Sequence, residues 1–180
     1  MNQLPLLAPN TIGIFSPESI GQANVHTDSP ASTSYFSEIY NLLVPFRLAM
    51  PAEFGYGWAW TGDTVSGNFD VGIYDAAGTL LASTGAVAMA ASGAQVSFFA
   101  NGGHITIGPG LFYMAIGTSA GASTSFRTVS ALVIGGRPWS MLGVALDTQG
   151  IPLPATVSFS TFRGISNQIP IFGISKYIML

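Results

Sequence analysis

The stretch GNFDVGIYDAAGTLLASTG, residues 67–85, decides the fold class. Its first half alternates Phe69, Val71 and Ile73 with other residues, which is the period of a β-strand with one buried face. The following DAAG, residues 75–78, suits a type I turn, in which the aspartate accepts a hydrogen bond at the first position and the glycine takes the left-handed conformation at the last. A partner strand is expected directly after this turn. The stretch therefore predicts a β-hairpin.

Other short strands surround the hairpin. Residues 34–50 fit either a strand or a short helix, and the strand is favoured because Pro45 argues against a long helix. Further strands are predicted at residues 94–100, 104–107, 111–117, 127–134, 155–162 and 169–174, with a corner at 108–110 and a turn at 135–138. Short strands at this spacing are typical of a β-sandwich or jelly roll.

The predicted fold is therefore all-β, a jelly-roll-like β-sandwich with extended arms at both ends. We expect an extended N-terminal arm over residues 1–34, the sandwich over 35–165, and an apolar C-terminal strand or arm over 166–180. Both ends are too apolar for free tails, as LPLLAP and IPIFGISKYIML illustrate. Since chain termini are ordered only when something holds them, these ends are expected either to be clamped by neighbouring subunits or to dock on the chain's own sandwich.

Charged residues are unusually scarce. The chain has five Lys and Arg and eight Asp and Glu, or 7% of its 180 residues, where a soluble domain usually has about 25%. A chain of this size buries about two-thirds of its extended surface on folding, so its core needs no disulfides. Charge depletion is typical of protein interfaces. A polar but uncharged surface of Ser, Thr, Asn, Gln and Gly is the alternative, and we favour assembly with identical or different neighbours over it.

Two classes of partner are disfavoured by the distribution of residues. The five cations are scattered, whereas nucleic-acid binding needs clustered cations to neutralise phosphates. No charged residue lies between Asp75 and Arg127, but glycines and Pro109 interrupt this stretch before an apolar run of about 20 residues can form. We therefore expect neither nucleic-acid binding nor a membrane span. The first cation is Arg47, so no secretory signal is expected either.

Catalytic chemistry has little support in the sequence. The two histidines are His26 and His104, and no GxSxG or other nucleophile motif accompanies them. Carboxylate pairs drawn from Glu53, Asp63 and Asp70 would arise by chance among eight acids. There are no cysteines, and no P-loop, calcium loop or dinucleotide fingerprint. We predict a protein that is not an enzyme and that has no catalytic residues, no cofactor and no metal.

Aromatic residues provide the candidate binding site. Tyr56, Trp58 and Trp60 alternate along YGWAW, so in a strand all three project from one face. Such a row either forms part of the core, which the intervening glycine favours, or stacks on sugar rings or anchors a protein interface. Arg137 and Trp139 flank Pro138 in a predicted loop, a combination that suits an interface hot spot or a simple loop anchor.

The strings VGIYDAAGTLLASTG and IGPGLFYMAIG, at residues 71–85 and 107–117, resemble a recurrent pattern in bacteriophage virion proteins. The pattern is the strand, turn and Pro-Gly corner of jelly-roll-like domains in fibre, baseplate and head-decoration components. The resemblance covers roughly residues 67–117 and departs from the pattern in the long Ala/Ser/Gly link at 86–94. Sugar-binding and adhesive bacterial domains use similar hairpins.

The resemblance implies a non-enzymatic virion component, made in the host cytoplasm without a signal peptide. It further implies a symmetric homo-oligomer, with a trimer as one candidate, that also contacts other virion proteins. The alternative is a carbohydrate- or receptor-binding module that uses Tyr56, Trp58 and Trp60 on a host glycan. A third hypothesis, a hydrolase, requires a serine or a carboxylate beside His104 in a cleft.

Overall fold

The computed structural model of the chain describes residues 14–15, 23–24, 31–34, 41–100, 103–119, 125–131, 145–147, 150–159 and 168–176. In this described part every regular element is a β-strand and every strand pairing is antiparallel. Within the same residues no helix is long and apolar enough to cross a membrane. The prediction of an all-β fold is confirmed.

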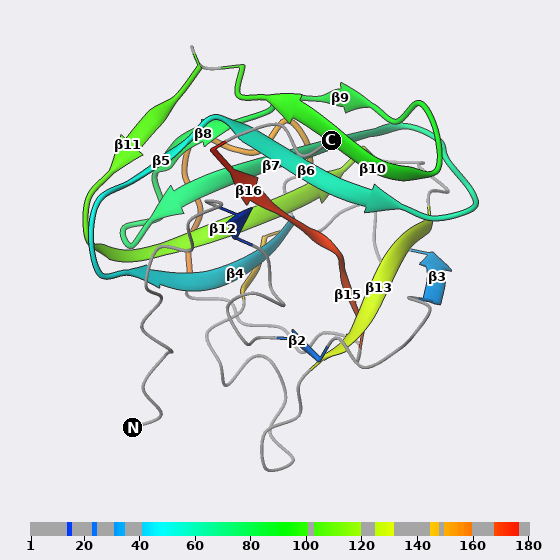
Figure 1. Cartoon of the computed structure of the whole chain (residues 1–180), viewed down its shortest axis with the longest axis horizontal. Helices are drawn as coiled ribbons and strands as arrows, with labels where there is room; N and C mark the ends of the chain where they lie inside the picture. Colours follow the sequence, from blue (N-terminus) through cyan, green and yellow to red (C-terminus); the bar gives the residue numbers. More distant parts are fainter. Residues whose placement is uncertain are drawn as a thin grey trace.

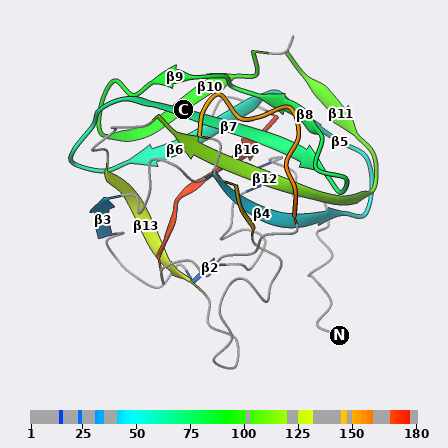
Figure 2. The same ribbon diagram turned by 180° about the vertical axis from the view of Figure 1, so that it is seen from behind.

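Two sheets face each other (Figures 1 and 2). Sheet A runs in the order β14 (Ala145–Asp147), β4 (Asn41–Leu48), β12 (Gly110–Thr118), β7 (Asn68–Asp75) and β8 (Leu80–Ser83), and β9 (Val87–Ala88) also pairs with β7. The predicted strand in residues 34–50 is thus β4, and the link at 86–94 contains β9. Sheet A carries the hairpin on which the fold prediction was based.

Sheet B is built around β6 (Tyr56–Thr61). Its order is β1 (Ile14–Phe15), β16 (Phe172–Ser175), β6, β13 (Ser125–Ala131) and β15 (Gln168–Pro170). Three strands lie off this path: β10 (Gly93–Phe98) pairs with β6, while β2 (Ala23–Asn24) and β3 (Ala31–Ser34) pair with β13. A separate two-stranded sheet joins β5 (Ala52–Phe54) to β11 (Ile105–Ile107). The strand β16, near the C-terminus, therefore docks on the chain's own sandwich.

The main core fills the space between the two sheets. Sheet A contributes Val71 and Ile73 from β7, and sheet B contributes Phe172 and Ile174 from β16, all with no exposed surface. Gly57 lies at a close approach of the two sheets, because an added Cβ there would come within 2.8 Å of the Val71 Cβ. Glycine in β6 is thus a packing requirement.

The predicted hairpin forms as β7 and β8. Asp75 Oδ1 accepts hydrogen bonds from the backbone N–H of Ala77 (2.9 Å) and of Thr79 (2.8 Å). The Gly78 N–H donates to the Asp75 carbonyl (3.1 Å), and Gly78 has a φ of +87°. The aspartate and the left-handed glycine play the roles that the sequence predicted.

The expectation that β7 buries only one face is wrong. Asp70, Gly72 and Tyr74 on the second face are buried as well. Residues 150–159, here called the strap, lie over this outer face of sheet A, and Leu153 and Val157 of the strap pack with Tyr74. The strap makes β7 a central strand with both faces covered.

The strap replaces most of a predicted strand. Of the strand predicted at 155–162, residues 155–159 form only a single bridge, from Thr156 to Thr79, and residues 160–162 lie outside the described part. The segment does use its backbone polar groups, since the Leu80 N–H donates to Ala155 O and the Val157 N–H donates to Gly78 O. The turn predicted at 135–138 also lies outside the described residues.

Candidate interaction surface

The row formed by Tyr56, Trp58 and Trp60 lies on the outer face of sheet B. Gly57 and Ala59 between them point to the core, so the three aromatic side chains project the other way, as the spacing predicted. Their exposure differs along the row. Trp60 is 42% exposed, whereas Trp58 is 6% exposed and packs with the core residues. The row is thus part core and part surface.

The strand β10 adds a second exposed ring. Its register places Phe98 beside Tyr56, Val96 beside Trp58 and Ala94 beside Trp60. Phe98 is 44% exposed, and its ring centroid lies 5.1 Å from that of Tyr56 at an interplanar angle of 72°. The sequence alone did not point to Phe98, because the face on which this side chain lies depends on the pairing of β10 with β6, which periodicity does not specify.

His104 completes an aromatic cluster with Tyr56 and Phe98. Its ring lies 5.9 Å from Tyr56 and 5.7 Å from Phe98, in both cases edge to face. The imidazole rests directly on Gly55, where an added Cβ would meet it at 2.6 Å. The rings therefore support one another, an arrangement that aromatic quadrupoles favour.

Charged side chains at this end of sheet B are paired. Glu53 binds the His104 Nδ1 at 3.3 Å through one oxygen and the Lys176 Nζ at 2.7 Å through the other. The hydrogen bond from Lys176 lowers the pKa of the Glu53 carboxyl below its usual value. All three side chains are about one-third exposed, so water screens these pairs.

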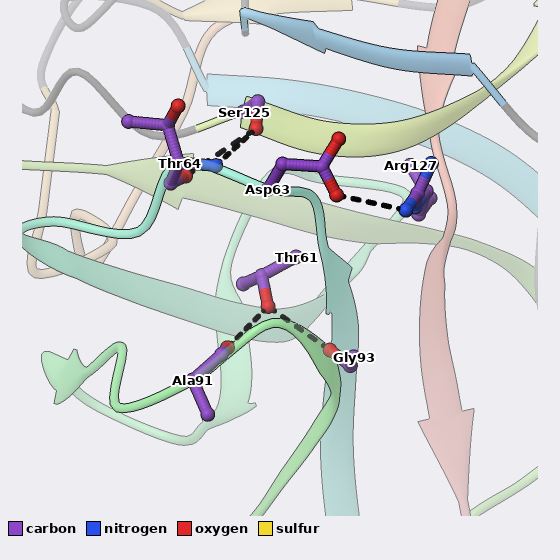
Figure 3. Close-up of polar contacts among 7 residues, drawn as sticks. All are labelled: Thr61, Asp63, Thr64, Ala91, Gly93, Ser125 and Arg127. Atoms are coloured by element: carbon purple, nitrogen blue, oxygen red, sulfur yellow. Dashed lines mark hydrogen bonds and ion pairs between the residues drawn. The ribbon is translucent and has the colours of Figure 1, made fainter.

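The far end of β6 has its own ion pair and hydrogen bonds (Figure 3). Arg127 on β13 binds Asp63 at 3.0 Å. The Thr61 hydroxyl lies 2.6 Å from the Ala91 carbonyl and 3.0 Å from that of Gly93, which ties the segment before β10 to β6. The two contacts of the Thr61 hydroxyl hold the start of β10 in place.

The carboxylates considered as catalytic pairs are not brought together. Glu53 precedes β6 and Asp63 follows it, while Asp70 is fully buried under the strap. Asp70 accepts hydrogen bonds from the Leu153 N–H (2.8 Å) and the Thr84 hydroxyl (3.1 Å). Burial is the main influence on its carboxyl and raises the pKa of Asp70, against the opposing effect of these hydrogen bonds. Its role is to hold the strap and the end of β8.

One requirement of the hydrolase hypothesis is met. A carboxylate, Glu53, lies beside His104, but Lys176 holds the same carboxylate. Within the described part of the chain, no serine or threonine hydroxyl is hydrogen-bonded to the imidazole, and no three acidic or histidine side chains group together as metal ligands. The arrangement is that of a partly exposed ion-pair cluster.

The remaining predicted site residues are not placed. Arg137 and Trp139, like His26, lie outside the described residues. The interpretation of Arg137 and Trp139 as an interface loop stays a prediction.

Comparisons with protein-family models, with curated proteins and with solved structures found no match for this chain.

Proposed function

We propose that this chain is a non-enzymatic structural component of a bacteriophage particle and assembles through the outer face of sheet B. The observation that carries the proposal is the exposure of large apolar rings on that face. Trp60 and Phe98 are 42% and 44% exposed, in a chain with only 7% charged residues. Burying such rings against a neighbour is favourable, and aromatic side chains are enriched at the centres of interfaces.

The virion assignment comes from the hairpin and corner pattern of residues 67–117. The Asp75 turn, β7 and β12 belong to that pattern, and the jelly-roll connectivity and a symmetric homo-oligomer with other virion proteins are parts of the same proposal. Paired charges at both ends of the face agree with a surface that is covered in the assembled particle.

Particle composition tests this proposal. Particles sedimented from cells that carry the gene are expected to contain the intact chain in a fixed copy number relative to the major head protein, by quantitative peptide mass spectrometry. A chain found only in the soluble fraction of lysed cells would overturn the virion assignment.

A host glycan remains the second candidate ligand, because Trp60 offers an exposed ring. Against glycan binding, Tyr56, Phe98 and His104 pack edge to face, whereas sugar stacking needs a flat ring face that is free.

Tryptophan fluorescence of the purified chain, titrated with a panel of host-surface oligosaccharides, distinguishes glycan binding from assembly alone. Saturable quenching that is lost in Trp60→Ser would favour the glycan.

A further inference from the structure

Within the part of the chain that the structure describes, strand β10 has an open edge. It pairs with β6 along one side, and the described residues supply no strand for the other side. None of its six residues is buried. Natural edge strands are usually blocked by charged residues, proline or bulges. The strand β10, GAQVSF, contains no charge and no proline, and its pairing with β6 is continuous.

The backbone groups on the open side can be assigned. The Phe99 N–H donates to Gly55 O across the β6 side, at 2.9 Å. Since hydrogen-bonding direction alternates along an antiparallel strand, the N–H and C=O groups of Ala94, Val96 and Phe98 point away from β6. The Ala100 N–H, next in this series, donates to Ser83 O at 2.8 Å. The open edge therefore ends at Phe98.

We propose that β10 pairs with β10 of a second copy of this chain, antiparallel, about a two-fold axis at Val96. In this register Val96 lies opposite Val96, and Ala94 of each copy lies opposite Phe98 of the other. It is the register that engages every outward residue of the edge at once. The two copies of sheet B then form one continuous sheet. This pairing deepens the proposed function by naming the partner and the strand through which assembly begins.

Side-chain size and charge favour a second copy over an unrelated strand. Each Phe98 faces the small Ala94 of the other copy, and Trp60 lies beside that alanine in its own sheet. The pairing thus gathers the exposed rings of both copies on one face. The charges that flank the strand are already paired, Glu53 with Lys176 and Asp63 with Arg127, so two identical surfaces meet without like-charge repulsion.

Single cysteines test the register, because the chain has no cysteine of its own. Facing residues of a hydrogen-bonded antiparallel pair have Cα atoms about 5.5 Å apart, within the range of a disulfide. Full-length Val96→Cys is therefore expected to form a disulfide-linked dimer under mild oxidation. The matched control is Ala94→Cys, whose two cysteines would lie about 13 Å apart along the strands and stay unlinked. A mixture of Ala94→Cys and Phe98→Cys is expected to give the mixed dimer.

Equal cross-linking of Ala94→Cys and Val96→Cys, or none from folded Val96→Cys, would overturn the pairing. Amide exchange of the unmodified chain provides a second measurement that needs no substitution. Protection of Ala94, Val96 and Phe98 along with Gln95 and Ser97 is expected, while protection of only the latter two would contradict the proposal. Both measurements use purified chain, so they separate a failure of this pairing from a failure of the virion assignment.

Discussion

Asp70 shows how one buried carboxylate holds three parts of the fold. It sits on β7 and accepts hydrogen bonds from Thr84 after β8 and from Leu153 of the strap. Asp70→Asn would turn an amide N–H2 toward groups that are themselves donors. We expect a loss of about 1–3 kcal/mol in the free energy of unfolding at neutral pH. The control is Asp63→Asn, which removes an exposed ion pair and should cost about 1 kcal/mol or less. Equal losses in urea unfolding would contradict this role.

The pH dependence of stability also follows from Asp70. Burial raises the pKa of this carboxyl in the folded chain above the usual value of 3.8. Between these two pKa values the folded chain holds a proton that the unfolded chain has released, so stability from this group falls as pH rises through that window. The Asp70→Asn variant has no carboxyl at this position, so its stability lacks this pH dependence. The difference in unfolding free energy between the wild type and Asp70→Asn should therefore narrow as pH rises from below 3.8 to neutrality. A difference that widens would mean that hydrogen bonds to the carboxylate outweigh burial.

Glycine is required at position 78 for two reasons, its backbone conformation and the lack of space for a side chain. Its φ is +87°, and an added Cβ would collide with the Val157 carbonyl of the strap. Gly150 has a φ of +68° with open space around it. Gly150→Ala should cost about 1–2 kcal/mol from the left-handed conformation alone. Gly78→Ala should lower the free energy of unfolding by clearly more. The shift of the urea unfolding midpoint measures the loss in each variant. Equal losses would show that the strap moves aside without penalty.

At the level of elements, the strap is the part that periodicity could not predict. The alternation of β7 correctly placed Phe69, Val71 and Ile73 in the core, and Asp75 and Gly78 correctly placed the turn. The same alternation says nothing of what covers the other face. The strap reaches β7 from about 80 positions away, as the hydrogen bond from the Tyr74 hydroxyl to Pro154 O illustrates. Its residues have no strand period because the strap packs on sheet A through Leu153 and Val157 and forms only a single β-bridge, from Thr156 to Thr79.

The candidate interaction surface was likewise predicted from the sequence only in part. The spacing of YGWAW correctly put Tyr56, Trp58 and Trp60 on one face of β6. It could not rank their exposure, which depends on neighbouring strands, nor could it bring in Phe98 and His104 from other strands. Long-range pairing supplies both pieces of information.

Removing an anchor of the strap should expose the outer face of sheet A. Leu153 is 4% exposed and packs with Val157 and Tyr74. Leu153→Ala is expected to cost about 2–5 kcal/mol and to speed amide exchange at Val157. Met50→Ala, at a side chain that is 50% exposed, is the control and should change neither. Unchanged exchange at Val157 in Leu153→Ala would mean that the strap is held by its backbone bonds alone.

At the scale of the whole molecule, the account depends on what covers the outer face of sheet B. In a chain of low overall charge, the open β10 edge and the exposed rings of Trp60 and Phe98 lie on or beside that face. Each favours association between copies, since burying apolar rings and pairing free backbone groups both lower the free energy.

The most direct test of assembly is the mass of the full-length chain in solution, by light scattering over a range of concentrations. The account predicts an even multiple of 18.7 kDa for the wild type and for Met50→Ser. For a Trp60→Ser, Phe98→Ser double variant that keeps its thermal transition, it predicts a fall toward the β10-paired dimer, twice 18.7 kDa, because serine retains the backbone groups of β10. A wild-type mass of 18.7 kDa at every concentration would contradict it.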